Sequence, residues 1–315
     1  MQDLRAVGLN TVYVETWKNG YTNFPSHTLK SIIGTTDRNP TIGTSRDLLQ
    51  ETLIHAHRNQ MAYYGWFEYG VMSQFIGAGG NPNNPLSNYM KSRGWLLQNQ
   101  SGQYADGTNG GFAYMNVAVP EVRQFIINMT LEAVNRYDLD GIQFDDHMAW
   151  PVNFGFDSTT INLYTSQTGN PAPTSPTNPQ FSAWRQQKVT DFALEFYTAV
   201  KNARPEIKFS VSPSITTFST TNYNVNWPLW EAQEIFDEFA IQMYRSNISD
   251  FNSIVNAQVN PFKPNDLEKL VFGLRINPSP LTPYADLQSM ILRSRTEGAS
   301  GHSLWFSDGV LESYE

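Results

Sequence analysis

The sequence predicts an α/β fold, a TIM-type (β/α)8 barrel that forms a single domain over residues 1–315. Two observations carry this prediction: short apolar runs alternate with longer helical patterns, and many of the runs end in polar residues on one face. Strands separated by helices are typical of parallel βαβ units. The length of 315 residues suits one barrel, because barrels of roughly 250 residues or more commonly form one domain.

Seven short segments have the apolar character of buried strands. They are Thr11–Trp17, Ala62–Phe67, Gly141–Asp145, Lys208–Ser212, Glu238–Tyr244, Leu270–Leu274 and Gly301–Phe306. A closed barrel of this type has eight strands. We therefore expect the first strand to be missing from the given chain and to lie upstream of Met1. Met1 opens directly on a predicted amphipathic helix that ends at Gly8, which agrees with this expectation.

Helical patterns fill most of the spaces between these strands. The predicted helices are Ser45–Asn59, Pro120–Tyr137, Ser182–Ala203, Trp227–Phe236, Ser249–Asn256 and Pro283–Glu297. Two long loops, at about 69–119 and 147–181, interrupt the pattern, and the second contains a Pro/Ser/Thr tract at Gly169–Pro179. The alternation of strand and helix is the same on both sides of this tract. We therefore interpret the loops as functional insertions in one domain.

Composition limits the classes of partner. Lys and Arg number 21 against 29 Asp and Glu, so the net charge is −8, which disfavours nucleic acid and anionic membrane surfaces. Charged residues are only 16%, while aromatic residues reach 13%, a balance that suits uncharged polar ligands such as sugars. The absence of cysteine excludes a disulfide scaffold and a thiol nucleophile. No run of apolar residues is long enough for a membrane span, and no signal peptide opens the given chain.

The polar residues of the predicted strands occupy alternate positions and so share one face, which we call the interior phase. Side chains alternate between the two faces of a strand, so Gln143 and Asp145 lie opposite Ile142 and Phe144. The same rule places a set of polar and aromatic side chains on the interior phase, at or just past strand ends: Glu15, Glu68, Asp145, Ser212, Gln242, Tyr244, Arg275 and Trp305. The carboxyl-terminal rim is where barrel enzymes gather their catalytic groups.

Asp145, Asp146 and Glu68 are the candidate catalytic residues. Hydrolysis of a glycosidic bond needs one carboxylic acid for the leaving oxygen and one carboxylate at the anomeric carbon. Asp145 has the interior phase, whereas Asp146 must rotate inward where the strand ends or support its neighbour. Glu68 is flanked by aromatic residues that raise the pKa of a carboxyl group, which suits a proton donor. Retaining and inverting chemistry both remain open.

The remaining candidates are substrate-binding residues. Aromatic platforms for sugar rings are expected at Trp17, Trp66, Tyr69, Trp150, Tyr244 and Trp305. Polar contacts to the substrate are expected from Glu15, His147, Ser212, Gln242 and Arg275. We predict no metal and no cofactor, although His147 with Asp145 and Glu68 leaves a metal-dependent hydrolase as an alternative. No Gly-x-Ser-x-Gly elbow and no phosphate-binding loop occur in the sequence.

Five segments, in this order, resemble the bacterial glycosyl-hydrolase-like family ten, which has a TIM-barrel domain. They are Asn10–Tyr13, Trp17 with Gly20–Ser26, Trp66–Gly70, Asp138–His147 and Gln242–Arg245. The resemblance implies a hydrolase of glycosidic bonds, with cell-wall glycan as one substrate class and a location outside the cytoplasm. It matches Asp145, Asp146 and Glu68 to the family's acidic positions and Tyr244 to its strand-end tyrosine. The family's first strand is absent here, and Glu15 stands where a neutral residue is expected.

We therefore predict a glycoside hydrolase that uses two carboxylates on a polysaccharide or cell-wall glycan such as a peptidoglycan-type strand. The alternatives are a carbohydrate-binding barrel without catalysis, a metal-dependent hydrolase that uses His147, and an interaction scaffold. The expected partner is a glycan, with no nucleic acid and no membrane span. The sequence leaves the sugar, the linkage, endo or exo action and the oligomeric state open.

Overall fold

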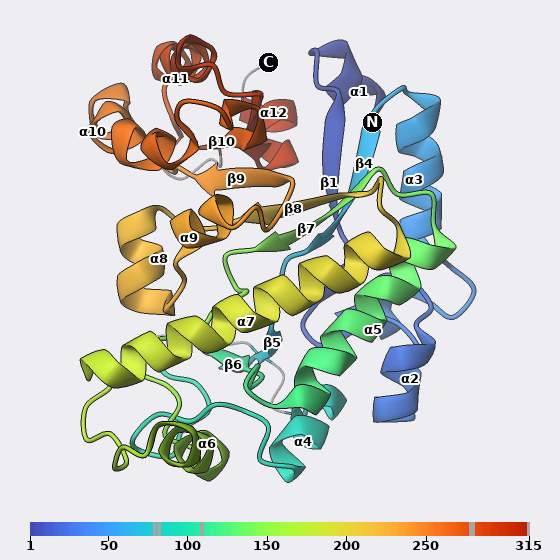
Figure 1. Ribbon diagram of the computed structural model, residues 1–315. Coiled ribbons are helices and arrows are strands. Elements are labelled where there is room, and N and C mark those ends of the chain that lie inside the picture. The colour runs from blue at the N-terminus through green and yellow to red at the C-terminus, as the bar shows by residue number, and fades with distance from the viewer. Residues whose placement is uncertain (78–79, 81–82, 108–109, 277–280, 314–315) are drawn as a thin grey trace.

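Seven parallel strands form one curled sheet, an open half-barrel with helices (Figure 1). The computed structural model describes residues 1–315 apart from 78–79, 81–82, 108–109, 277–280 and 314–315. The sheet order is β1 (Thr11–Glu15), β4 (Ala62–Phe67), β7 (Gly141–Asp145), β8 (Lys208–Ser212), β9 (Glu238–Gln242), β10 (Leu270–Arg275) and β11 (Gly301–Trp305). The predicted α/β barrel-type fold is confirmed. Within the described residues β1 and β11 are the two edges, so the seven strands leave the sheet open.

Each predicted helix is present, and side-chain caps mark the start of some of them. The helices are α1 (Gln2–Ala6), α3 (Leu48–Arg58), α5 (Pro120–Arg136), α7 (Pro179–Ala203), α9 (Trp227–Ala232), α10 (Ile248–Val259) and α11 (Tyr284–Glu297). Helix α3 begins later than the expected Ser45, because Asp47 Oδ1 accepts a hydrogen bond from the Gln50 N–H at 3.0 Å. Helix α7 begins earlier than the expected Ser182, because Asn178 Oδ1 accepts from the Phe181 N–H at 2.9 Å.

The long loops contain secondary structure that periodicity did not predict. Within the described residues they add β5 (Met72–Phe75), α4 (Pro85–Ser92), β6 (Phe112–Tyr114) and α6 (Ser158–Thr168). Elsewhere the chain adds the hairpin β2 (Trp17–Lys18) and β3 (Tyr21–Thr22), α2 (His27–Ile33), α8 (Thr216–Tyr223), α12 (Ser307–Ser313) and the short 3-10 helices Pro40–Ile42, Asn260–Phe262 and Leu267–Lys269. These elements are short, so they contain too few apolar residues for a helical or strand periodicity to be recognised in the sequence.

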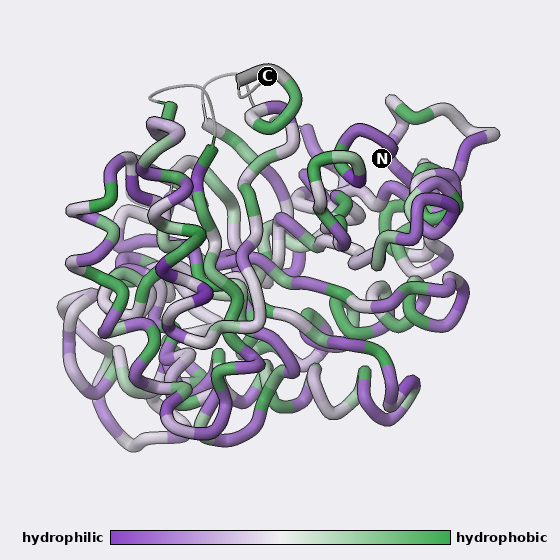
Figure 2. The backbone as a smooth tube through the Cα atoms, turned by 90° about the horizontal axis from the view of Figure 1, so that it is seen from above, coloured by the Kyte–Doolittle hydropathy of each residue, from purple (hydrophilic) through white to green (hydrophobic). Residues whose placement is uncertain are grey.

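The core lies between the sheet and its helices. Helix α3 is amphipathic and buries Leu49, Leu53 and Ala56, and Figure 2 shows hydrophilic and hydrophobic residues alternating along the outer helices. Phe144 of β7 stacks on Phe67 of β4 with ring centroids 4.9 Å apart. No described helix is long and apolar enough to cross a membrane.

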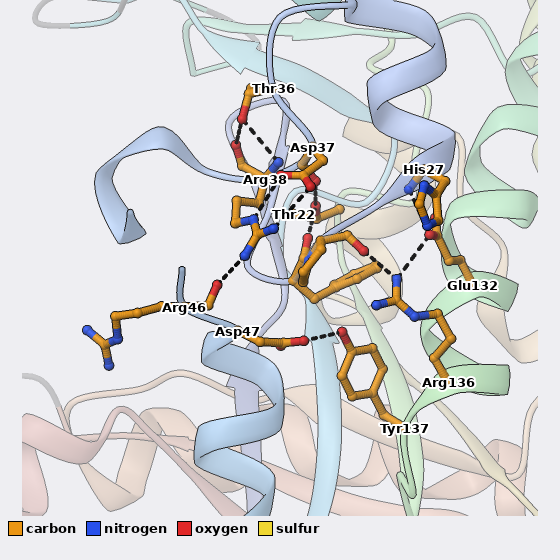
Figure 3. A network of polar contacts seen from close by, with 12 residues as sticks. Thr22, His27, Thr36, Asp37, Arg38, Arg46, Asp47, Glu132, Arg136 and Tyr137 are labelled. Atoms are coloured by element: carbon orange, nitrogen blue, oxygen red, sulfur yellow. Dashed lines mark hydrogen bonds and ion pairs between the residues drawn. The ribbon is translucent and has the colours of Figure 1, made fainter. Parts of the chain in front are cut away.

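A polar network ties the segment after β1 to helix α5 (Figure 3). Glu132 of α5 accepts hydrogen bonds from Ser26 Oγ and from the His27 N–H, both at 2.7 Å. Arg136 donates to the Pro25 carbonyl, and Tyr137 Oη donates to Asp47 Oδ2 at 2.6 Å. The network fixes the stretch between β3 and α3. It therefore also restrains the hairpin that leads into this stretch at the carboxyl end of β1.

Candidate active site

The concave face of the sheet carries polar side chains in the phase that alternation predicts. Gln143 Nε2 of β7 donates to Ser210 Oγ of β8 at 2.9 Å. Tyr13 Oη of β1 donates to Glu238 Oε1 of β9 at 2.8 Å, so these two side chains meet across the hollow of the sheet. On the opposite phase, Phe144 packs edge-on against helix α7. The alternation therefore separates a polar interior from an apolar face under the helices.

Asp145 ends β7 and is held by three N–H donors. Trp66 Nε1 of β4 donates to Oδ2 at 2.9 Å, and the Asp146 N–H donates to Oδ1 at 2.8 Å. Gln242 Nε2 of β9 also donates to Oδ1. Burial raises the pKa of Asp145 well above its usual range, and the adjacent charge of Asp146 adds to this rise. Trp66 and Gln242, expected to bind substrate, thus have their side-chain N–H groups directed at a catalytic candidate.

Asp146 lies beyond the strand, where the backbone no longer alternates. Its Oδ2 accepts from Ser214 Oγ at 2.7 Å, and its Oδ1 lies 3.5 Å from His147 Nε2. The other ring nitrogen, His147 Nδ1, lies 3.3 Å from the Glu68 carbonyl oxygen. His147 therefore links the ends of β4 and β7. Asp146 thus lies next to Asp145 with Ser214 and His147 as its neighbours.

An aromatic cage encloses the His147 ring. The ring centroids of Phe112, Tyr114 and Tyr223 lie 5.4, 6.3 and 6.3 Å from that of His147. With both nitrogens facing protein oxygens, the imidazole is oriented by the protein. Among the described residues, no three His, Asp or Glu side chains are grouped as metal ligands.

Glu68 follows β4 and forms a second charged cluster with Glu15 and Lys18. Lys18 Nζ lies 2.6 Å from Glu15 Oε2 and 3.4 Å from Glu68 Oε2. Burial raises the pKa of Glu68, the cation of Lys18 opposes this rise, and the charge of Glu15 adds to it. The end of β1 and the hairpin after it thus supply a cation, Lys18, and a further carboxylate, Glu15, to the surroundings of Glu68.

Tyr244 and Trp305 form an aromatic pair on the far side of the sheet. Their rings stack with centroids 5.5 Å apart and an interplanar angle of 21°, and Trp305 is 38% exposed. Burial raises the pKa of the Tyr244 phenol, and the charges of Asp145 and Asp146 raise it further. The indole of Trp305 is thus exposed beside the Tyr244 ring and offers a surface for stacking.

Ser212 and Arg275 lie at the ends of β8 and β10. Ser212 is buried, and its Oγ donates to the Ala240 carbonyl at 2.9 Å, so this hydroxyl is engaged within the sheet. Arg275 is half-buried and pairs in register with Trp305. Arg275 thus flanks the aromatic pair.

The prediction of sugar-stacking platforms is wrong for Trp17 and Trp150, and Tyr69 has little exposed surface. Trp17 and Trp150 are fully buried. Trp17 Nε1 donates to the Gly70 carbonyl at 3.2 Å, and Trp150 Nε1 donates to the Phe154 carbonyl at 2.9 Å. Rings inside the core offer no face to a sugar. Tyr69 is 5% exposed and packs edge-on against Phe112, so it shapes the cage around His147.

Sequence reasoning missed several neighbours of the carboxylates. Lys18 sits three residues after Glu15, and its charge at a strand end is a signal that could have found it. Ser214 has the phase of Ser212 and lies just past β8. Tyr114 and Tyr223 come from a loop insertion and from the end of α8, where no periodic signal marks them.

A parallel α/β half-barrel with carboxylates at the ends of its strands is the arrangement of TIM-type glycoside hydrolases. The glycoside hydrolase domain of PgaB (BpsB) from Bordetella bronchiseptica has a similar fold, with a TM-score of 0.70 and 14% identity over 96% of this chain and 86% of that domain. The α-L-fucosidase isoenzyme 2 from Paenibacillus thiaminolyticus has a TM-score of 0.66 and 13% identity over 96% of this chain and 41% of that enzyme. These likenesses show the fold.

The family model of glycosyl hydrolase-like 10 matches residues 1–271, and the chain belongs to this family. The glycosyl hydrolase DigH of Escherichia coli O6:H1 is 26% identical over 226 residues, or 68% of this chain and 46% of that protein. The glycosyl hydrolase YngK of Bacillus subtilis is 21% identical over 218 residues, or 68% of this chain and 38% of that protein. The chain thus spans less than half the length of these relatives.

Proposed function

We propose that this chain hydrolyses glycosidic bonds of a glycan with Asp145 and Glu68 as its two catalytic carboxyl groups. The observation that carries the proposal is that adjacent strands β4 and β7 end with a half-buried carboxyl group, Glu68, and a buried one, Asp145, both with raised pKa values. Carboxyl groups in such settings are characteristic of acid–base sites. Membership of a glycosyl hydrolase-like family supports the same reaction class.

Asp145 is assigned to the reacting sugar. Burial disfavours its charged form in the free protein, whereas the oxocarbenium-like transition state of glycoside hydrolysis brings positive charge to the anomeric carbon. The positive charge that develops at the anomeric carbon therefore stabilises the ionised form of Asp145. The attraction between this carboxylate and the sugar is strongest in the transition state. The three N–H donors keep the carboxylate in one orientation.

Glu68 is assigned to the leaving oxygen. Its raised pKa keeps a proton on the carboxyl group at higher pH than an exposed glutamate does, which suits a general acid. Lys18 and Glu15 adjust that pKa in opposite directions.

We expect Lys18→Gln to move the alkaline limb of the kcat/KM profile to higher pH. Lys18 lowers the pKa of Glu68, so loss of its cation raises this pKa and keeps the general acid protonated further up the pH scale. The measurement is kcat/KM against pH for the wild type, Lys18→Gln and the remote control Lys30→Gln. An unmoved limb, or one moved to lower pH, would show that Glu68 is not the titrating acid.

We expect Trp305→Ala to weaken glycan binding by about tenfold with little effect on folding. The indole is exposed and stacks on Tyr244, so its loss removes a stacking face worth about 1.4 kcal/mol without opening the core. Calorimetric titration with a cleaved glycan and the thermal midpoint are the two readouts. A collapsed midpoint with unchanged affinity in the folded fraction would make Trp305 a core residue.

The substrate class that we propose is a bacterial cell-wall glycan, with a location outside the cytoplasm. The likeness of the quoted motifs to a family that acts on such glycans supports both. The test is a digest of a glycan panel, peptidoglycan strands included, with products identified by mass. Products from the wild type support hydrolysis. Binding without products on every glycan would support a carbohydrate-binding barrel, and products lost on chelation would support a metal-dependent hydrolase.

A further inference from the structure

A cavity of about 590 Å³ lies where the two long insertions meet helix α5. Trp95 from the first insertion forms one wall, the start of α5 forms another, and Asn162 and Ser166 of α6 form a third. Both insertions follow strands that carry catalytic candidates, β4 and β7. Figure 1 shows α4, α6, β5 and β6 gathered at the same end of the molecule. None of the residues assigned above to catalysis lines this cavity.

The Trp95 ring is held in place by its neighbours. The Tyr89 ring meets it edge-on at 6.2 Å, and the Arg93 guanidinium lies 5.5 Å from its centroid while covering the Tyr89 ring at 3.7 Å. Trp95 is half-buried, so part of the indole stays accessible in the cavity. A fixed aromatic ring is the kind of surface on which the apolar face of a pyranose stacks without loss of side-chain entropy.

The rest of the lining combines apolar and hydrogen-bonding groups. Val119, Pro120 and Leu163 supply apolar surface. Asn162 and Ser166 are exposed, one helical turn apart on α6, and present an amide and a hydroxyl. Such a lining matches a ligand with an apolar ring face and hydroxyl edges.

The charges of the cavity argue against an anionic ligand. Glu121 is the single ionisable group in the described lining. Pro120 takes the first position of α5 and has no N–H, and Glu121 already places a negative charge at this helix end. The start of α5 therefore attracts no phosphate or carboxylate. The described lining thus favours a ligand without negative charge, such as a neutral sugar chain.

The first insertion joins this cavity to the candidate active site. The Asn116 N–H donates to the Trp95 carbonyl at 2.8 Å, and Leu96 pairs with Met115 as an antiparallel bridge. These residues continue directly from β6, whose Phe112 and Tyr114 enclose His147. Two paired stretches of the first insertion thus connect Trp95 in the cavity with the rings around His147.

From this geometry we propose that the cavity is a secondary binding site for uncharged glycan, which holds a stretch of polymer away from the bond being cleaved. The inference rests on the proposed glycan substrate, but it concerns residues outside that site. It assigns Trp95 as the stacking surface and Asn162 and Ser166 as hydrogen-bonding groups to sugar hydroxyls. Its consequence is tighter binding of long glycans than of short ones.

The test uses the full chain with Asp145→Asn as a background that binds without turnover. Electrophoresis through gels that contain a soluble neutral polysaccharide, either a glucan or glycol chitin, measures retention. Ser166→Arg fills the cavity from an exposed position, and Trp95→Ala removes the ring. Ser289→Arg is the matched control, because Ser289 is also exposed, lies on helix α11 and, like Ser166, hydrogen-bonds a backbone carbonyl of the preceding turn.

We expect Ser166→Arg and Trp95→Ala each to raise the dissociation constant for the long glycan about tenfold, while Ser289→Arg leaves it unchanged. In the active chain, Ser166→Arg should leave the turnover of a short oligosaccharide unchanged. Equal retention of Ser166→Arg and Ser289→Arg on every glycan would overturn the secondary site, even if the chain is an active hydrolase. Retention that depends on Trp95 without any cleavage products would support this site and contradict the proposed hydrolysis instead.

Discussion

Asp145→Asn is expected to lower kcat by ~10³-fold or more while the chain stays folded, because removal of a catalytic carboxylate has an effect of this size. The substitution keeps the shape of the side chain and one oxygen that can accept from Trp66 or Gln242. It removes the negative charge that the developing oxocarbenium ion needs. Product formation over time and the thermal midpoint measure the two effects separately.

Asp146→Asn is the matched control for this prediction. Asp146 accepts a hydrogen bond from Ser214 and lies beside His147, so its replacement changes the surroundings of Asp145. We expect a smaller loss of kcat than for Asp145→Asn. Turnover at the wild-type rate in Asp145→Asn would remove Asp145 from the mechanism, and Asp146 or Glu15 would take its place.

Glu68→Gln is expected to lower kcat by ~10³-fold on a natural glycan, where the leaving oxygen must be protonated. Glutamine keeps the size of the side chain and its position next to Lys18 but holds no transferable proton. The loss should be much smaller on an aryl glycoside whose leaving group departs without protonation. Comparison of the two substrates in the same variant isolates the acid step from binding.

Glu15→Gln provides the comparison for Glu68. Both carboxylates contact Lys18, so both substitutions weaken the same ion-pair cluster. A general acid at Glu68 predicts leaving-group dependence for Glu68→Gln alone. Equal losses on the natural glycan and the aryl glycoside would contradict a proton-donor role for Glu68.

The sheet and the ends of its strands could be predicted from the sequence because alternation acts locally. β4, β7 and β8 have the predicted bounds, and β9 and β11 end within two residues of them. Each of these strands carries one apolar and one polar phase, so register and facing follow from neighbouring residues. The ends of β4 and β7 therefore bring Glu68 and Asp145 to the same end of the sheet.

What each side chain contacts could not be predicted, because the contacts join distant segments. Trp66 and Gln242 were expected to face the substrate, but Asp145 accepts hydrogen bonds from both, and Gln242 reaches it across β8. Trp17 was expected at the rim, but its ring packs edge-on against Phe125 of α5. The alternation along a strand predicts on which face of the sheet a side chain lies. It does not predict which aromatic rings pack into the core.

The most direct measurement of the central claim is the digestion of the best glycan of the panel in heavy-oxygen water. Hydrolysis places one solvent oxygen at each new reducing end, so the product masses report the reaction itself. The account predicts labelled products from the wild type, a rate lower by ~10³-fold or more from Asp145→Asn, and near-equal folding of both. Unlabelled products, or labelled products formed at the same rate by Asp145→Asn, would contradict it.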